Sequence, residues 1–220
     1  MPTTSGSRRP AAGGGRWVDV APERLARWID GFGARHGSVA HTVADGVLRL
    51  RAVDMAEAEI LPPPGARVAD DLDGFVAAAG TPRRIGLLLA RKSAYAVGVA
   101  AGPDLVTSKV DSSYVQSRTA AGGWSQQRFA RRRANQAKAA AGDASDTVAR
   151  LLLPETDTLA TIVAGGDRRT VDAILADRRL EPVSTLVDER FLDVPEPRLA
   201  VLRDAVAAAR AVRIRIVDPE

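Results

Sequence analysis

The stretch IGLLLARKSAYAVGVAAGPDLVTSKV, residues 85–110, contains three apolar runs separated by connections of two residues. The runs occupy residues 85–91, 94–101 and 104–110, and a fourth candidate strand follows at residues 113–120. Connections this short join antiparallel neighbours, because a parallel crossover needs a dozen or more residues. These residues therefore predict an antiparallel meander.

Downstream of the meander, candidate strands and helices alternate. A long helix is predicted over residues 125–152, and further helices over 167–177 and 197–210. The intervening strands are predicted at residues 158–165, 181–188 and 212–218. Alternation of this kind indicates βαβ units, so we expect an α/β fold whose mixed sheet has an antiparallel meander followed by βαβ units.

Upstream, the proline-rich stretch LPPPG at residues 61–65 marks a boundary between two units. Residues 1–16 are polar and glycine-rich and are predicted to be a disordered tail. Residues 17–62 contain a predicted helix at 21–37 and a predicted strand at 46–54, which indicate a small α+β N-terminal unit. The larger unit is predicted to span residues 66–220 and to begin with a helix at 70–80.

The composition excludes several kinds of site. The chain has no cysteine, so disulfides, thiolate zinc sites and cysteine nucleophiles are ruled out, and this fits the reducing cytoplasm. Its two histidines, His36 and His41, have no acidic cluster nearby, which argues against a histidine metal site or a Ser-His-Asp triad. No apolar stretch approaches the roughly 20 residues that cross a bilayer, so no membrane partner is expected.

Positive charge is concentrated in one part of the chain. Residues 108–138 hold seven basic side chains and only one acidic side chain, Asp111, whereas the whole chain has a net charge of only +4. Such a local excess favours a polyanionic partner, although arginines also serve as a solvated helix face. Alanines at 130, 134, 137 and 141 recur at helical spacing, which predicts that this stripe packs on the sheet and that the arginines project outward.

Within residues 108–138, the stretch at 122–133 reads GGWSQQRFARRR. A strand-to-helix turn with Ser125 as the helix N-cap is the simplest interpretation of the first residues. The whole motif, however, resembles the catalytic loop of class-one release factors of archaea and eukaryotes, Gly-Gly-Gln-Ser-x-x-Arg-Phe-x-Arg-x-Arg. Seven of its eight fixed positions match without a gap: Gly122, Gly123, Ser125, Arg128, Phe129, Arg131 and Arg133.

The chain departs from this motif at Trp124, which stands where those factors carry their catalytic glutamine. Glutamines follow at positions 126 and 127, and a Ser-Gln pair of this kind resembles the Vms-like branch of the superfamily, known from ribosome-associated quality control. The resemblance makes Gln126 the candidate catalytic amide, with Gln127 in reserve and Gly122, Gly123 and Ser125 shaping the loop.

What the resemblance implies is a peptidyl-tRNA hydrolase, or codon-independent release factor, that acts on stalled or split large ribosomal subunits. Its expected fold is the release-factor catalytic domain with a ribonuclease H-like arrangement. Its expected partners are the rRNA of the large subunit and the acceptor end of peptidyl-tRNA, and no cofactor or metal is expected. The residues assigned to RNA contact are Arg118, Trp124, Arg128, Arg131, Arg132, Arg133 and Lys138.

Two other functions stay open. A nuclease acting near the tRNA 3′ end would need clustered carboxylates for metal ions, but the first core strand has none, and Asp111 and Asp167 are placed to begin turns or cap helices. A ribosome- or RNA-binding module without catalysis is the second alternative. Gly165 and Gly166 precede a predicted helix and could form an anion site, but they lack a complete phosphate-binding pattern, and a plain turn is favoured.

Overall fold

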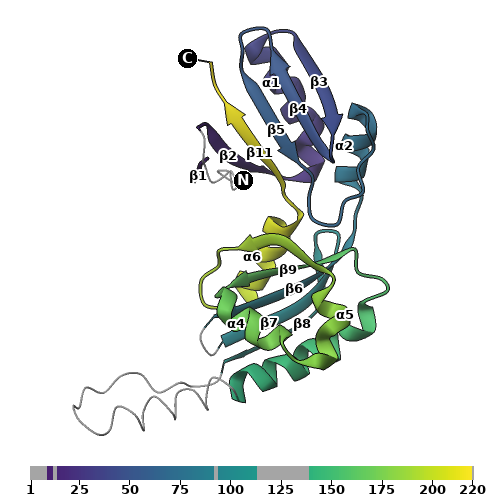
Figure 1. The fold of residues 1–220 in the computed structure, drawn as a ribbon, viewed down its shortest axis with the longest axis vertical. Helices are drawn as coiled ribbons and strands as arrows, with labels where there is room; N and C mark the ends of the chain where they lie inside the picture. The colour runs from purple at the N-terminus through teal and green to yellow at the C-terminus, as the bar shows by residue number, and fades with distance from the viewer. Residues whose placement is uncertain (1–8, 12–13, 92–93, 113–138, 220) are drawn as a thin grey trace, which may run out of the picture. The chain divides into compact units, whose positions relative to one another are not determined.

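The computed structural model describes residues 9–11, 14–91, 94–112 and 139–219. It divides into two compact units, one formed by residues 1–82 together with 207–220 and the other by residues 83–206. Each unit is built on its own sheet (Figure 1).

The first unit contains a six-stranded sheet in the order β1-β2-β11-β5-β4-β3, in which all neighbours are antiparallel. Two α-helices and a short 3-10 helix accompany this sheet. The elements are β1 (Arg9–Pro10), β2 (Arg16–Val20), η1 (Pro22–Arg24), α1 (Leu25–His36), β3 (Val39–Ala44), β4 (Val47–Ala52), β5 (Glu57–Leu61), α2 (Leu72–Gly80) and β11 (Val212–Val217).

One face of this sheet is apolar and the other is charged. On β4, Leu48 and Leu50 are buried whereas Arg49 and Arg51 are exposed, as the two-residue period of a strand requires. The buried face packs against α1 and α2, whose largest buried side chains, Leu25, Phe32 and Phe75, join the same cluster. The first unit is therefore a two-layer α+β structure with one open sheet face (Figure 1).

The structure divides the chain differently from the predicted ranges. Residues 66–82 and 207–220 were expected in the larger unit, but they belong to the first. Phe75 and Ala79 of α2 are buried in the first unit's core, and Ile214 of β11 pairs with Val18 and Ile60 in the middle of its sheet. Within the predicted tail, residues 9 and 10 pair with β2 as β1.

The second unit contains a five-stranded sheet in the order β10-β9-β6-β7-β8. Its antiparallel part runs through β6, β7 and β8, and β9 and β10 are added in parallel on the other side of β6. This mixed arrangement confirms the predicted meander followed by βαβ units. The strands are β6 (Arg84–Arg91), β7 (Ala94–Ala101), β8 (Asp104–Ser112), β9 (Thr161–Gly166) and β10 (Val187–Leu192).

Helices cover both faces of this second sheet (Figure 1). The helix that is described over residues 139–151 shares one apolar cluster with α4, α5 and the near face of the sheet. On the opposite face, a methyl group added to Gly98 of β7 would meet Leu202 of α6. The remaining elements are η2 (Leu153–Glu155), α4 (Arg168–Leu175), η3 (Arg178–Leu180), α5 (Glu181–Ser184) and α6 (Leu199–Arg210).

One predicted element changes type. The strand expected over residues 181–188 begins as the helix α5, and the strand β10 starts only at Val187. Pro182 lies in the first turn of α5, where a backbone N–H would have no partner within the helix, so its absence costs nothing. Val183 is buried in the apolar cluster of the second unit. The predicted strand 113–120 and the predicted helical residues 125–138 lie outside the described residues.

Candidate functional site

The residues predicted to carry the chemistry all lie in one stretch of the chain. Gly122, Gly123, Ser125, Gln126 and Gln127 fall within residues 113–138, outside the described residues. The same holds for the residues predicted to contact RNA, which are Arg118, Trp124, Arg128, Arg131, Arg132, Arg133 and Lys138. We call residues 113–138 the basic segment. The structure describes the strand that precedes it and the helix that follows it.

The preceding strand, β8, is paired along its whole length. Its last residue, Ser112, lies opposite Ala94 at the start of β7, and Asp111 lies opposite Tyr95. The carboxylate of Asp111 accepts a hydrogen bond from the backbone N–H of Ser112 at 2.8 Å and lies 3.7 Å from the ammonium of Lys109. The chain thus enters the basic segment from a fixed strand end.

The following helix is anchored on the sheet by residues four apart. Ala144, Val148 and Leu152 are fully buried in the apolar cluster, and Ala141 packs at its margin. The hydroxyl of Ser145, also buried, lies 2.9 Å from the carbonyl oxygens of Ala141 and Ile174, which ties this helix to α4. The small-residue stripe predicted for this helix is therefore present at Ala141, and its members at 130, 134 and 137 lie outside the described residues.

A hydrogen bond that sequence reasoning missed joins the following helix to β7, the strand that pairs with β8. Tyr95 on β7 is buried, and its hydroxyl lies 3.1 Å from the hydroxyl of Thr147 and 3.4 Å from the carbonyl oxygen of Asp143. Tyr95 also lies opposite Asp111 of β8, so β7 connects the strand that enters the basic segment with the helix that follows it. The only sequence signal was a tyrosine within an otherwise apolar strand.

Both ends of the basic segment lie at one edge of the second sheet. This edge is formed by the ends of the strands and not by the side of an outer strand. The pairings Ser112–Ala94, Ala94–Arg91 and Ala90–Gly166 lead along this edge from β8 to β9, and Gly165 pairs with Leu192 at the end of β10. It is the edge at which the parallel strands β6, β9 and β10 have their carboxyl ends. In open α/β sheets, ligands bind outside the carboxyl ends of the strands. The basic segment therefore joins the sheet at the edge that this fold class uses for binding.

The turn from β9 to α4 at this edge is structural. Gly166 has a φ of +100°, and a Cβ there would lie 2.3 Å from the carbonyl oxygen of Ala90. That oxygen already accepts the backbone N–H of Asp167 at 2.7 Å. The positive φ and the close approach of the Ala90 carbonyl oxygen each require glycine at position 166, and neither feature involves a ligand.

Asp167 acts as the N-cap of α4. Its carboxylate accepts the backbone N–H of Thr170 at 2.8 Å and the hydroxyl of the same residue at 2.9 Å. These hydrogen bonds, the backbone one first, lower the pKa of Asp167, and the nearby charges of Arg169 and Arg91 lower it further. Among the residues that the structure describes, no three His, Cys, Asp or Glu side chains cluster in a way that could hold a metal ion.

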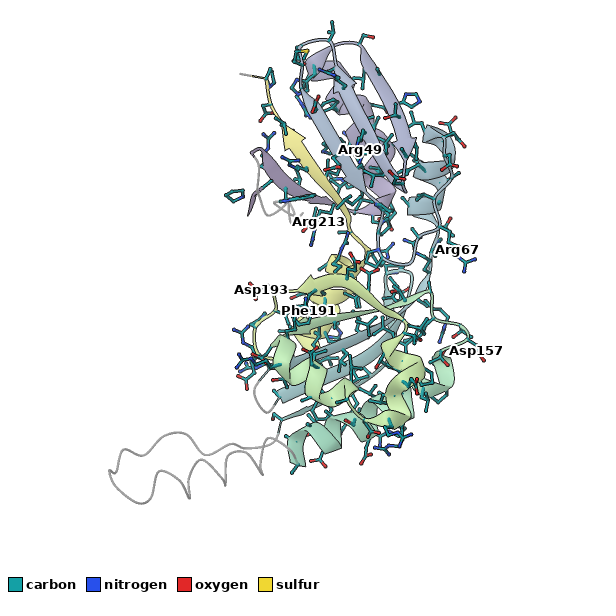
Figure 2. All side chains as sticks on the ribbon, viewed as in Figure 1. Arg49, Arg67, Asp157, Phe191, Asp193 and Arg213 are labelled. Atoms are coloured by element: carbon teal, nitrogen blue, oxygen red, sulfur yellow. The ribbon has the colours of Figure 1, made fainter. Side chains whose placement is uncertain are left out.

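Side chains of both charges lie near each other at the ends of β6 and β10. Arg91 donates a hydrogen bond to the carbonyl oxygen of Val194 at 2.8 Å and lies 3.9 Å from the carboxylate of Asp193. Together with Pro195 and Glu196 these residues line a cavity of about 470 Å³. The guanidinium of Arg168 lies 4.3 Å from the ring centre of Phe191 on β10. Phe191 and Asp193 are labelled in Figure 2. The charges in this cavity are mixed, so it is not a dedicated anion site.

The charge of the second unit is divided sharply between two parts. Its described residues carry twelve arginine and lysine side chains against fifteen aspartate and glutamate side chains. The basic segment carries six basic side chains and no acidic one. An acidic body therefore holds a strongly basic insertion, which is the pattern expected where only one part of a domain meets a polyanion.

Comparison with known protein families finds a match that covers the second unit. The family model described as "Actinobacteria/chloroflexi VLRF1 release factor" matches residues 83–215, which is more than half of the chain. Among curated proteins no match was found. No helix in the described part of the chain is long and apolar enough to cross a membrane.

The solved structures that match this chain do so at low identity and with low TM-scores. An archaeal translation termination factor, aRF1, is 16% identical with a TM-score of 0.41, and the match covers 74% of this chain and 47% of that one. Dom34 of S. cerevisiae, titled a translation termination-like factor involved in RNA quality control pathways, is 10% identical with a TM-score of 0.33, over 91% and 66% of the two chains. The chain thus spans about half the length of the aRF1 structure it matches.

Proposed function

The chain belongs to the Actinobacteria/Chloroflexi VLRF1 release factor family, and from this membership we propose that it is a peptidyl-tRNA hydrolase. Its proposed substrate is the ester of peptidyl-tRNA held on a stalled or split large ribosomal subunit, and release there is independent of a codon. The proposed place of action is the cytoplasm, where the ribosomes are.

The observation that carries this proposal is the motif at residues 122–133 within a release-factor domain. The domain match begins at residue 83 and includes the strand before the motif and the helix after it. Support also comes from the two anchored ends, since Ser112 is paired in the sheet and Thr147 is bonded to Tyr95. A fixed base of this kind suits a catalytic loop, because chemistry depends on holding the reacting group within a narrow range of positions.

The proposed chemistry is addition of water to an ester carbonyl. The water oxygen bonds to the carbonyl carbon, the bond from that carbon to the ribose oxygen of tRNA breaks, and a proton passes to the departing oxygen. Gln126 is proposed to orient this water and to support the oxyanion that forms, because an amide offers both a donor and an acceptor. A carboxylate at this position would be repelled by the surrounding RNA phosphates.

The arginines of the basic segment are proposed to hold the domain on RNA. Contacts to phosphate position a protein without reading sequence, and this suits a factor that acts wherever the ribosome has stalled. The acidic surplus on the rest of the second unit supports this division, because like charge keeps the body of the domain away from rRNA while the basic segment is attracted. The proposed partners are therefore large-subunit rRNA and the acceptor end of peptidyl-tRNA.

Peptide release from isolated large subunits that carry peptidyl-tRNA tests the proposal. At saturating protein, we expect Gln126→Ala to slow release by on the order of a hundredfold or more, as is typical when one polar group of an oxyanion site is removed. Gln127→Ala is the matched control, because it removes an identical amide from the neighbouring position of the chain. Binding of each variant to subunits is measured in parallel by sedimentation.

The products separate the proposal from its alternatives. A hydrolase leaves tRNA intact, a nuclease leaves tRNA without its 3′ end, and a binding module leaves peptidyl-tRNA unchanged. Loss of release in Gln127→Ala alone would assign the catalytic amide to position 127. Release at the wild-type rate in both variants would overturn catalysis by this amide pair.

A salt titration tests the arginines separately from the chemistry. Reversing Arg128, Arg131 and Arg132 to Glu is expected to weaken subunit binding and to flatten its dependence on salt, because fewer counterions are released. Binding that is unchanged across the titration would mean that these arginines form only a solvated face.

A further inference from the structure

In the part of the chain that the structure describes, the outer edge of β3 is an unpaired sheet edge of the first unit. β3 is the last strand in the order β1-β2-β11-β5-β4-β3, and among the described residues only β4 pairs with it. Its six residues, VAHTVA, keep an unbroken register with β4 from Val39 opposite Ala52 to Ala44 opposite Val47. A straight strand of this length presents a row of backbone donors and acceptors at its free edge.

The register shows which backbone groups point outward. The carbonyl oxygen of Ser38 accepts the N–H of Val53 across the β3–β4 ladder at 3.0 Å. In an antiparallel ladder, hydrogen-bonded pairs alternate with pairs that are not hydrogen-bonded. Val39, His41 and Val43 therefore direct their N–H and C=O groups away from β4, toward the free edge.

The other three sheet edges carry features that discourage strand addition, and β3 lacks them. β1 has only two residues and contains Pro10. β8 carries Lys109 and pairs with β7 through a shift in register, and β10 carries three consecutive charged residues and a similar shift. Charges, proline, shortness and bulges are the usual protections of an edge strand. β3 contains no Asp, Glu, Lys or Arg, no proline and no bulge.

The two faces of β3 differ in what they offer an added strand. Val39 and Val43 pack at the margin of the apolar core, so a neighbouring strand with apolar residues on that face would extend the core. On the open face, Ala40 and Thr42 are small and lie opposite Arg51 and Arg49 of β4. These residues line a groove of about 500 Å³ on the open face.

Arg49 and Arg51 have acidic neighbours on the β5 side only. Toward β5, Arg49 lies 3.3 Å from Glu59 and Arg51 lies 3.5 Å from Glu57. Toward β3 they meet small uncharged residues, and 62% of the Arg51 side chain is exposed. Figure 2 shows Arg49 on this open face of the sheet. An acidic side chain on a strand beyond β3 can reach across Ala40 or Thr42 to these guanidinium groups.

We propose that the edge of β3 binds an extended segment of a partner protein in which apolar residues alternate with acidic residues. The backbone of the segment pairs with Val39, His41 and Val43, its apolar side chains cover the core margin, and its acidic side chains face Arg49 and Arg51. β5 is an internal precedent, because its sequence EAEIL places Glu57 and Glu59 beside the same two arginines from the other side. Strand addition of this type obtains affinity from the backbone and specificity from alternate side chains.

A second copy of this chain is a poorer occupant. Two β3 strands paired across a two-fold axis would place alanine and threonine beside each other on the open face. No acidic group from β3 would then approach Arg49 or Arg51, since VAHTVA has none. Charge complementarity therefore favours an acidic partner over self-association.

Binding of blocked hexapeptides to the full chain, measured by isothermal titration calorimetry, tests the proposal. The probe is Glu-Val-Glu-Val-Glu-Val, and the controls are Lys-Val-Lys-Val-Lys-Val and a peptide with three Glu followed by three Val. We expect binding of the alternating acidic peptide alone. His41→Pro removes one outward N–H and no bond to β4, and should weaken binding about tenfold, whereas His41→Ala keeps the N–H and should bind as the wild type does.

Two further variants test the charges. Arg49→Gln with Arg51→Gln should weaken binding of the acidic peptide and flatten its salt dependence. Arg213→Gln is the matched control, because Arg213 lies on the same sheet but on β11, two strands beyond β4, beside Asp19 at 3.5 Å. Thr42→Glu keeps β3 intact and should exchange the preference, so that the basic peptide binds and the acidic one does not. This variant remains informative if His41→Pro fails to fold.

The outcomes are distinct from those of peptide release. Peptide binding that is unchanged in His41→Pro and in Thr42→Glu would overturn the proposal. Dimers that form with increasing concentration and are abolished by His41→Pro would assign the edge to a second copy and overturn it as well. The inference does not rest on hydrolase activity, and His41→Pro should release peptide from large subunits at the wild-type rate.

Discussion

The two sheets of this protein differ in how many of their faces are covered. Every residue of β6 between its terminal arginines is buried, and so is every residue of β7 except its last. On β4 of the first sheet, buried and exposed residues alternate, with Leu48 and Leu50 inside and Arg49 and Arg51 outside. A sheet with helices on both faces leaves only its edges for function, whereas a sheet with one open face offers that face as well.

Polar groups are distributed accordingly. The buried polar side chains among the described residues are Ser145, Thr147 and Thr161, and all three lie in the second unit. In the first unit, the ion pairs on the open face are exposed, and each contributes about 0–1 kcal/mol. Charge on the first sheet is therefore available for recognition at little cost in stability, whereas the three buried polar side chains of the second unit have hydrogen-bond partners inside the fold.

The largest effects should come from the covered faces. Leu87 and Leu88 are adjacent on β6 and point to opposite faces, yet both are fully buried. We expect Leu87→Ala and Leu88→Ala each to lower the free energy of unfolding by about 2–5 kcal/mol. On β4, by contrast, adjacent residues should differ. Leu50→Ala should lower the free energy of unfolding by a similar amount, whereas Arg51→Ala should change it by no more than about 0.5 kcal/mol. Urea denaturation measures all four, and a small effect at either leucine of β6 would contradict coverage of both faces.

Glycines with positive φ should differ between the sheets. Gly46, in the turn between β3 and β4, has a φ of +72° and only Val68 near its missing Cβ, at 3.9 Å. Gly166 adds a backbone contact at 2.3 Å to its φ of +100°. We expect Gly46→Ala to cost about 1 kcal/mol and Gly166→Ala more than the 1–3 kcal/mol that is typical of backbone strain alone. Thermal unfolding of both variants checks the order.

A glycine of the opposite kind is the control for these variants. Gly142 lies in the helix over residues 139–151, and no atom lies within 4 Å of the position its Cβ would take. Gly142→Ala should stabilise the protein by about 0.5–1 kcal/mol. Equal losses at positions 46 and 166 would mean that the close approach of Ala90 is relieved by a small shift.

A smaller effect is expected for the buried hydrogen bond between Tyr95 of β7 and Thr147 of the helix that follows the basic segment. Tyr95→Phe removes the hydroxyl that lies 3.1 Å from Thr147, and should lower the free energy of unfolding by about 0.5–1.5 kcal/mol. A double-mutant cycle with Thr147→Val, followed by denaturant unfolding, isolates the pair. Strictly additive losses would show that the two hydroxyls do not stabilise each other.

The smallest effect should appear only in acid. The pKa of Asp167 is lowered first by the backbone N–H of Thr170 and then by its hydroxyl, so this carboxylate stabilises the fold above its unfolded pKa. That stabilisation is lost as the pH falls through the lowered, folded pKa. Asp167→Asn keeps a capping side chain but cannot titrate, so its stability should fall less steeply with acid than that of the wild type. Unfolding in urea at a series of pH values compares the two slopes, and parallel curves would contradict this role.

The alternation of apolar runs with short connections was sufficient to predict the second sheet. Three runs joined by two-residue links became β6, β7 and β8, because strands this close in sequence can only return antiparallel. The strand predicted over 181–188 was wrong in type at its start, since a short apolar run does not distinguish a buried helix from a strand, and Pro182 favoured the helix. The candidate site could be predicted as a motif, and its geometry stays a prediction because residues 113–138 lie outside the described residues.

The sequence did not predict which strands that are distant along the chain pair with one another. The pattern VRIRIV near the end of the chain predicts a strand but does not say which sheet receives it. In the structure, β11 lies between β2 and β5, about two hundred residues from the first and one hundred and fifty from the second in sequence. Its apolar face, Val212, Ile214 and Ile216, matches the core of the first unit.

By itself, the sequence determined the periodicity of each element, the basic segment with a motif that resembles that of release factors, and the exclusion of cysteine chemistry, because each of these depends only on residue types and their spacing. Only the tertiary structure decided which unit holds α2 and β11, that Tyr95 bonds to Thr147, and that β3 is the last strand of the first sheet. These features depend on which distant residues meet, and many partners satisfy the same local pattern. Burial of the whole core selects among them.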